Sequence, residues 1–207
     1  MCLCMQQHML CHVQHIKNTK KYNGEDMSTP ALLLIDWQEK LFPAMPEIIR
    51  EKYAQNAETL LFFFEEQQWS LLVSEQYPQG LGGTIPILSR VQPQAISKMH
   101  FSALQEPVFF EKLEALQPTQ LVITGMETHI CVLQTVLDCV RRYQEDSAIE
   151  IVVISDAVLS RSKENWKAGL AYMEKVGATI MTTEMWLFTQ LHSAKHPLFK
   201  AVSKKIR

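Results

Sequence analysis

The sequence has no apolar run that approaches the length of a membrane span. Its longest candidates are Ala31 to Ile35 and Leu60 to Phe64, whereas a spanning helix needs about 20 apolar residues. It also lacks an excess of charge of either sign, because Lys and Arg number 20 and Asp and Glu 22, a formal net charge of -2. Since this net charge gives no electrostatic footprint for nucleic acid or an anionic membrane, we predict that neither is a partner.

Cysteine is scarce and unevenly placed. Of the five cysteines, Cys2, Cys4 and Cys11 lie near the N-terminus, and Cys131 and Cys139 lie far from them. An odd number with this spacing excludes the disulfide framework of a small secreted protein. We therefore expect a reducing, cytoplasmic setting.

The first 26 residues differ in composition from the rest of the chain. Met1 to Asp26 contain three Cys and three His but no continuous apolar stretch, so we expect no secretory signal peptide there. The spacing of these Cys and His residues matches no closed zinc pattern, so we predict no metal site there. We expect Met1 to Asp26 to be a disordered extension and residues 27–207 to form one folded domain.

Short apolar runs alternate with helical patterns over the rest of the chain, as in repeated β-α-β units. The run Ala31 to Ile35 is almost wholly apolar, as expected for a strand that helices cover on both faces. We expect further strands at Trp69–Ser74, Ala95–Lys98, Leu121–Thr124, Ile149–Ile154 and Ala178–Thr182. We expect helices at Glu47–Gln67, Val132–Tyr143, Lys163–Val176, Glu184–Leu191 and Pro197–Ile206. The predicted fold is a three-layer αβα, Rossmann-like single α/β domain, with helices on both faces of a mostly parallel sheet of about six strands.

Three polar residues lie at the ends of predicted strands. Asp36 follows the first strand, Lys98 ends the third, and Cys131 opens the helix after the fourth. The carboxyl ends of parallel strands meet at one edge of a sheet, where ligands bind. A helix N-terminus also presents free N–H groups and a positive dipole end, which lower the pKa of a thiol. Plainer roles are open as well: a turn cap for Asp36, a surface charge for Lys98 and an inert buried thiol for Cys131.

Around these residues the sequence resembles the isochorismatase-like cysteine hydrolases. Leu33–Gln38, with its Asp, is similar to the family's first-strand motif, and Ser97–Ala103 is similar to its lysine motif. Gly125–Val132 resembles the nucleophile segment, Gly-x-x-Thr-x-x-Cys. Two segments, Ser74–Gly82 and His196–Lys200, are most similar to the branch of isochorismatase domain-containing proteins.

The resemblance runs over about residues 31–199 and implies a catalytic triad of Asp36, Lys98 and Cys131 that uses no metal or other cofactor. On this pattern Cys131 attacks a carbonyl carbon and forms an acyl-enzyme. Lys98 favours the thiolate, and Asp36 takes the thiol proton and later activates water.

The resemblance also implies how the nucleophile segment is built. It implies a cis peptide bond between Met126 and Glu127, which aims the N–H groups of Glu127 and Cys131 into an oxyanion hole. Thr128 is then expected to hold this turn through its hydroxyl.

Departures from the family's patterns narrow the range of expected substrates. The stretch Glu75 to Pro78 has none of the histidines with which nicotinamidases of this superfamily hold a metal. The intact Cys131 favours hydrolysis of an amide, imide or ester, because some enzymes that cleave isochorismate do not need this cysteine. We expect a small-molecule substrate. Its expected contacts, which could instead be core or loop packing, are Gln38, Phe42, Gln76, Tyr77, Phe101 and Thr128.

The remaining polar residues near the motifs are expected to play structural roles. His100 and His129 flank the motifs and invite a general-base role, but hydrogen-bonded or exposed histidines are commoner. Cys139 is expected to pack in the core, and the segment with Asp156, Ser160 and Arg161 to fix loops or a subunit contact. Because relatives commonly form dimers to octamers, we expect a homo-oligomer. The competing hypothesis is a catalytically silent oligomeric scaffold or binding protein on the same fold.

Overall fold

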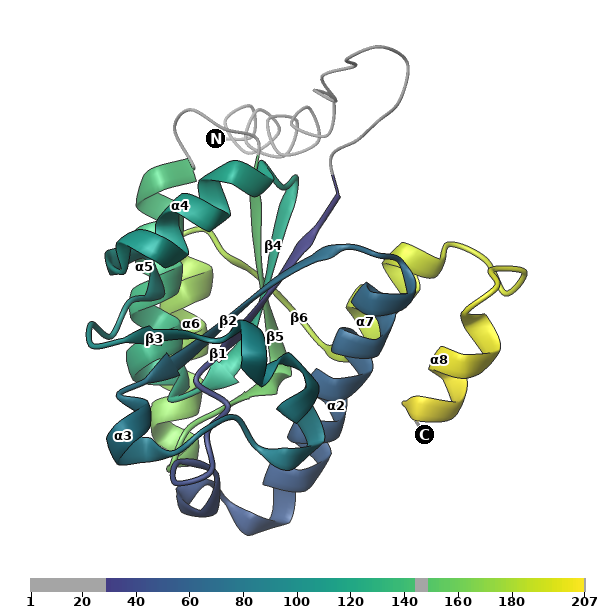
Figure 1. Ribbon diagram of the computed structural model, residues 1–207. Helices are drawn as coiled ribbons and strands as arrows, with labels where there is room; N and C mark the ends of the chain where they lie inside the picture. Colours follow the sequence, from purple (N-terminus) through teal and green to yellow (C-terminus); the bar gives the residue numbers. More distant parts are fainter. Residues whose placement is uncertain (1–28, 144–148, 207) are drawn as a thin grey trace, which may run out of the picture.

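Six parallel strands form the central layer of the molecule (Figure 1). They are β1 (Ala31–Ile35), β2 (Ser70–Gln76), β3 (Ile96–Lys98), β4 (Gln120–Met126), β5 (Glu150–Leu159) and β6 (Thr179–Met181). Their order in the sheet is β3-β2-β1-β4-β5-β6, and each neighbouring pair is parallel. The predicted α/β fold with a six-stranded parallel sheet is confirmed.

The computed structural model describes residues 29–143 and 149–206. The expected disordered extension, Met1 to Asp26, lies outside these residues, as do Cys2, Cys4 and Cys11. Within the described ranges, no helix combines the length and the apolar character that crossing a membrane requires.

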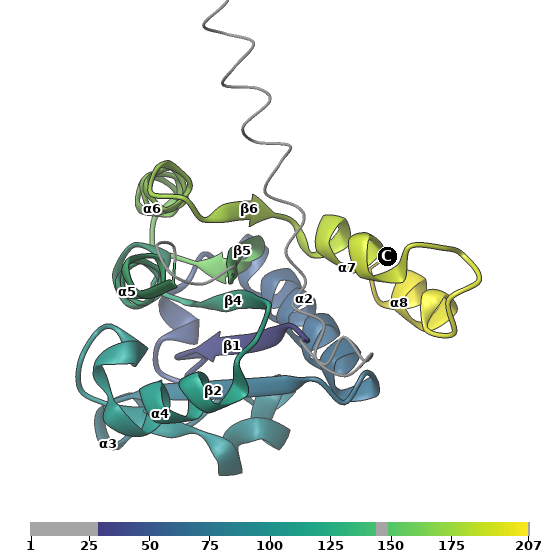
Figure 2. The same cartoon turned by 90° about the horizontal axis from the view of Figure 1, so that it is seen from above.

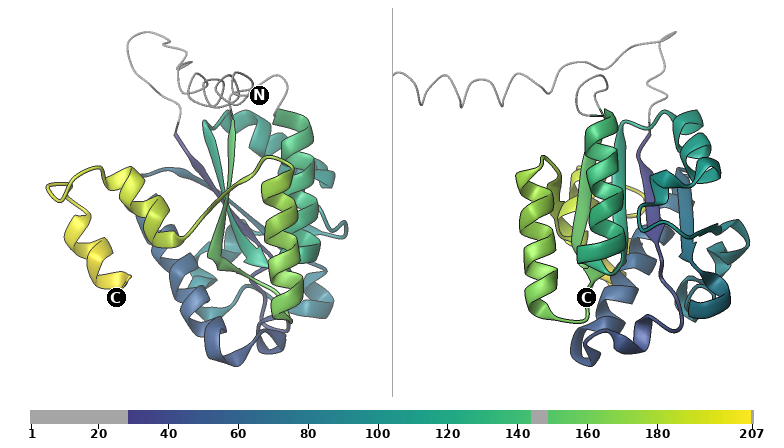
Figure 3. Two further views of the ribbon diagram at one scale, coloured as in Figure 1. Left: turned by 180° about the vertical axis from the view of Figure 1, so that it is seen from behind. Right: turned by 90° about the vertical axis from the view of Figure 1, so that its left-hand side faces the viewer.

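Helices cover both faces of the sheet (Figures 2 and 3). On one face lie α2 (Glu47–Glu66), α7 (Thr183–Leu191) and α8 (Phe199–Lys205). On the other lie α4 (Pro107–Leu116), α5 (Leu133–Tyr143) and α6 (Lys163–Lys175). Short helical turns complete the chain: η2 (Phe42–Ala44), α3 (Pro78–Leu81), η3 (Pro86–Gln94), η4 (Ala103–Gln105) and η5 (Thr128–Val132).

Helix α4 was not expected from the sequence. This helix buries Phe109 and Leu113, four residues apart, and its apolar stripe is therefore too short to stand out in the sequence. Pro107 at its first position is compatible with a helix start, because proline lacks the N–H that would be unpaired there. The other expected helices are present, with ends that differ by one or two residues.

Strand β1 shows why an uninterrupted apolar run is needed at the centre of this sheet. All five of its residues are buried. Leu32 and Leu34 pack in the core under α2, whereas Leu33 and Ile35 pack in the core under α5. Because successive side chains of a strand point to opposite faces, both faces of β1 must be apolar when helices cover both.

The order of the strands predicts where on the edge of the sheet a ligand would bind. β1 and β4 are neighbours although β2 and β3 come between them in the chain, so the connections from β1 and β4 run to opposite sides. In such sheets ligands bind beyond the carboxyl ends of these two strands. The register pairs Ile35 with Gly125, which brings the residues after both strands to the same place.

We expect Gly125→Ala to lower the free energy of unfolding by about 1–3 kcal/mol, the usual penalty for forcing a group into a packed core. A Cβ at Gly125 would run into the backbone carbonyl and Cβ of Ile35. The matched control is Gly80→Ala, whose Cβ would meet the ring of Tyr77, an exposed side chain that can turn away. Urea unfolding of the two variants compares them, and equal unfolding midpoints would contradict the prediction.

Candidate active site

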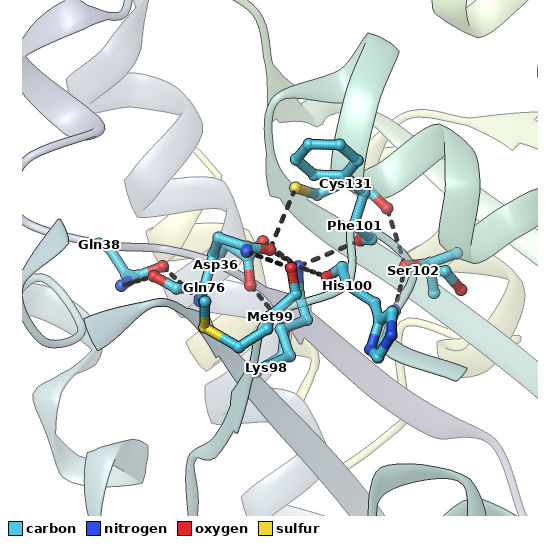
Figure 4. Close-up of polar contacts among 12 residues, drawn as sticks. Asp36, Gln38, Gln76, Lys98, Met99, His100, Phe101, Ser102 and Cys131 are labelled. Atoms are coloured by element: carbon cyan, nitrogen blue, oxygen red, sulfur yellow. Dashed lines mark hydrogen bonds and ion pairs between the residues drawn. The ribbon is translucent and has the colours of Figure 1, made fainter. Parts of the chain in front are cut away.

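Asp36, Lys98 and Cys131 meet at the carboxyl edge of the sheet (Figure 4). Asp36 directly follows β1, Lys98 is the last residue of β3, and Cys131 lies in η5, the turn after β4. Lys98 Nζ lies 2.8 Å from Asp36 Oδ2, and both side chains are 0% exposed. The fold thus brings together three residues that lie far apart in the sequence.

The Lys98 ammonium lies among four oxygen atoms. It donates hydrogen bonds to Gln76 Oε1 at 2.6 Å and to the carbonyl oxygens of His100 and Phe101, each at 3.1 Å. Asp36 Oδ2 is the fourth oxygen. A charge that is fully removed from water is stable only when it is paired and hydrogen-bonded in this way. The segment after β3 therefore folds back so that its carbonyl groups contact Lys98.

Asp36 is held in place by strand β2. Its φ is 53°, in the left-handed region that Asp tolerates better than most residues. Its N–H donates to Ser74 O at 3.1 Å, and Ser74 Oγ donates to Asp36 Oδ1 at 2.7 Å. Ser74 is a residue of this site that no sequence motif indicated. Its role follows from the register, which places it beside Ile35.

Cys131 is nearly buried, at 5% exposure. Burial raises the pKa of the Cys131 thiol to about 12; the nearby charge of Asp36 adds to the rise, and that of Lys98 partly offsets it. The expected lowering of this pKa is therefore wrong, because surroundings that exclude water disfavour the thiolate. In addition, Cys131 lies within η5, a π-helical turn that runs directly into α5, two residues before the first residue of that helix.

The turn that carries Cys131 begins at Glu127. This residue has a φ of 59°, and its carbonyl oxygen accepts hydrogen bonds from the N–H groups of Ile130 at 2.9 Å and Val132 at 3.3 Å. The expected cis bond between Met126 and Glu127 is wrong, since no cis peptide bond occurs in the described ranges. The left-handed conformation of Glu127 reverses the chain direction at this point.

Residues from the end of β5 support the same turn. Arg161 Nε lies 2.8 Å from Glu127 Oε1, and Glu127 itself is buried. His129 Nδ1 lies 3.0 Å from Ser160 Oγ and 3.5 Å from Glu127 Oε2. Arg161 and Ser160 thus fix a loop, as expected, and this loop is the one that carries Cys131.

The turn that carries Cys131 is held by a different threonine from the one expected. Thr128 is buried, and its hydroxyl has no hydrogen-bond partner within the part of the chain that the structure describes. Thr135 in α5 donates to Cys131 O at 2.8 Å and accepts from the N–H of Ala103 at 3.0 Å. The signal in the sequence was the spacing of four residues between Cys131 and Thr135, across which a helical hydroxyl reaches a carbonyl.

The residues expected to contact a substrate differ in the exposure and the hydrogen bonding of their side chains. The buried amide of Gln38 is bonded to protein backbone: its Oε1 accepts from Gln76 N, and its Nε2 donates to Gln76 O and one further carbonyl. Tyr77 and Phe101 are about half exposed, at 48% and 58%. Phe42 is half-buried against the core under α2.

Both histidines near Asp36, Lys98 and Cys131 have hydrogen-bond partners. His100 Nδ1 lies 2.9 Å from Glu106 Oε1, and His129 contacts Ser160 as described. Cys139 is 0% exposed and packs in the core, as expected. In residues 29–143 and 149–206, no group of three or more His, Cys, Asp or Glu side chains is arranged to hold a metal ion.

Comparisons with known proteins agree with this architecture. The profile of a family described as Isochorismatase domain matches residues 30–185. Isochorismatase domain-containing protein 2A of Mus musculus is 33% identical over 180 residues, which cover 85% of this chain and 82% of the relative. The corresponding protein 2 of Danio rerio is 32% identical and covers 84% of each chain.

Solved structures share the fold. The MAR1 ribonuclease of Caenorhabditis elegans superposes with a TM-score of 0.76 at 29% identity, covering 86% of this chain and 90% of that chain. The YcaC gene product of Escherichia coli, described as an octameric hydrolase of unknown specificity, gives 0.68 at 23% identity, with 79% and 80% covered.

We expect iodoacetamide to modify Cys131 faster than Cys139, because Cys131 retains 5% exposure and Cys139 has none. Since the pKa of Cys131 is raised to about 12, the thiolate remains a minor species at neutral pH. Between about pH 7 and pH 9 the rate should therefore rise about tenfold per pH unit, because only the thiolate reacts. Peptide mass spectrometry measures both sites. A plateau below about pH 8, or equal labelling of the two cysteines, would contradict the prediction.

Proposed function

The chain belongs to the isochorismatase family, and from this premise we propose that it is a metal-independent cysteine hydrolase of a small-molecule amide or related C–N bond, or of an ester. The observation that carries the proposal is the Lys98–Asp36 pair, 2.8 Å apart and fully buried at the edge where Cys131 lies. An ion pair without access to water is a weak source of stability. Beside a cysteine, such a pair is typical of a catalytic site.

The first chemical step transfers the acyl group of the substrate to Cys131. Sγ attacks the carbonyl carbon, an S–C bond forms, and the thiol proton passes to the Asp36 carboxylate. The Lys98 ammonium stabilises the sulfur charge during this transfer. The C–N bond then breaks, and the leaving nitrogen takes the proton from Asp36, which leaves a thioester on Cys131.

The second step releases the acid. A water molecule attacks the thioester carbon while Asp36 takes one of its protons. The S–C bond breaks, and the proton on Asp36 returns to Sγ, so the free enzyme is restored with a carboxylic acid as product. The protein supplies every group that these two steps require, and no cofactor enters them.

The raised pKa of Cys131 fits this mechanism. A thiol with a pKa of about 12 stays protonated until a substrate is present, which limits side reactions with other electrophiles. Once formed, its thiolate is a stronger nucleophile than that of a more acidic thiol. The Asp36 carboxylate, whose charge raises the pKa of Cys131, is also the proposed base that receives the proton.

The oxyanion of each tetrahedral intermediate is proposed to lie against the N–H groups of Glu127 and Cys131. Two N–H groups aimed at one oxygen stabilise developing charge without rearrangement. The φ of 59° at Glu127 and the ion pair with Arg161 support this arrangement, since they hold the turn that sets the direction of both groups.

Substrate contacts are proposed for the side chains around the triad. Tyr77 and Phe101 are exposed enough to meet a bound molecule, and Phe42 and Thr128 lie deeper. Two glutamines belong to the same proposed set. Gln38 supports the backbone of Gln76, and Gln76 contacts Lys98.

We also propose a homo-oligomer in the cytoplasm. The described octamer of the Escherichia coli neighbour supports the first part, although that likeness shows the fold alone. The Caenorhabditis elegans neighbour is named a ribonuclease. We propose a small molecule and not RNA as the substrate here, because a formal net charge of -2 gives no electrostatic footprint for a phosphate backbone.

We expect Cys131→Ala to abolish hydrolysis of any amide, imide or ester that the purified protein turns over, with a loss of at least about a thousandfold. Cys139→Ala is the matched control, since this thiol packs in the core away from the triad, and it should lower stability more than activity. Turnover of a compound panel, followed by liquid chromatography, measures both variants. Full activity in Cys131→Ala, or no turnover of any compound by the parent protein, favours the scaffold hypothesis.

We expect Asp36→Asn to separate thiol reactivity from catalysis. The Asp36 charge raises the pKa of Cys131, so its removal should lower that pKa and speed alkylation by iodoacetamide several-fold at about pH 8. Hydrolysis should nevertheless fall by at least about a hundredfold, because the base is lost. Labelling rates and turnover measured on one preparation test this. A parallel fall of both would contradict it.

A further inference from the structure

Gln76 touches two members of the triad (Figure 4). It is the last residue of β2, and its Oε1 accepts the shortest of the three hydrogen bonds that Lys98 Nζ donates, at 2.6 Å. The same oxygen lies 4.0 Å from Cys131 Sγ, at the limit of a thiol hydrogen bond. One amide oxygen is therefore shared between the ammonium and the thiol.

The orientation of this amide is fixed from two sides. Gln76 Nε2 donates to Met99 O at 3.0 Å, which turns Oε1 toward Lys98. The backbone of Gln76 is held by Gln38, which accepts from its N–H at 2.8 Å and donates to its carbonyl at 3.0 Å. The register pairs Gln76 with Lys98 on neighbouring parallel strands, so the two side chains leave the sheet on the same face.

We propose that Gln76 is a positioning residue that acts through Lys98, holding its ammonium against the Cys131 thiol while adding no charge of its own. An amide oxygen accepts hydrogen bonds but does not take up a proton, so the thiol proton can pass only to Asp36. A carboxylate at this position would hold Lys98 equally well, but it would oppose formation of the thiolate. This inference rests on the proposed hydrolase, but its test needs no substrate.

A residue that only contacts a substrate would not affect Cys131 in the free protein. The decisive measurement is therefore the rate of Cys131 alkylation by iodoacetamide, by peptide mass spectrometry on the full chain at about pH 8. We expect Gln76→Glu to slow it about tenfold, since a second carboxylate raises the pKa of the thiol by about one unit. Gln94→Glu is the matched control. It adds the same charge at an exposed residue of η3 and should leave the rate unchanged.

A second variant, Gln76→Met, keeps the length of the side chain and removes the acceptor. Cys131 alkylation should fall about threefold or more, because the ammonium is less firmly held at the sulfur. Acetylation of Lys98 by acetic anhydride should rise from its level in the parent protein, where this side chain is 0% exposed. The Gln76→Glu variant should keep Lys98 protected, since the new carboxylate holds it.

Cys139 serves as the internal reference for general loosening of the fold. A packing defect would raise the labelling of Cys139 and Cys131 together, whereas we expect Cys131 labelling to fall and Cys139 labelling to stay low. Parent-like labelling of Cys131 in both Gln76 variants, or a joint rise of both cysteines, would overturn the proposal. Neither result bears on whether Cys131→Ala retains hydrolysis, so a failure of this proposal can be told apart from a failure of the proposed function.

Discussion

The ion pair between Lys98 and Asp36 is the contact on which the arrangement of the site depends. Both side chains are fully buried, so each must find all of its partners inside the protein. This requirement accounts for the position of Ser74 on Asp36 and of Gln76 on Lys98. It also accounts for the course of the chain after β3, whose carbonyl groups turn back to the ammonium.

The same pair governs the chemistry of Cys131. Its two charges act on the sulfur in opposite directions: Asp36 raises the pKa of the thiol and Lys98 lowers it. Burial is the largest effect and also raises the pKa, so the protonated thiol is the resting form. These surroundings therefore favour a thiol that gives up its proton to a nearby base over a thiolate that is present in advance.

Unusual backbone conformations lie around the site. Asp36, Tyr77 and Glu127 each have a positive φ, and each comes directly after a strand that ends at this edge. Non-glycine residues in this region persist only where their surroundings hold them, and they are concentrated at functional sites. Here Ser74 contacts and holds Asp36, and Arg161 contacts and holds Glu127.

The sequence by itself determined the fold class and the position of the site along the chain. The apolar run at β1 and the alternation of strands and helices predict a parallel sheet, and the carboxyl ends of parallel strands meet at one edge. Asp36, Lys98 and Cys131 could be selected because each lies at such an end. Helix α4, with two buried residues, and the π-helical turn at Cys131 left no comparable pattern. Only the tertiary structure decided the environment of the Cys131 thiol and the contact of Gln76 with Lys98. Both depend on burial and on the register between strands, which place atoms from distant segments a few ångströms apart.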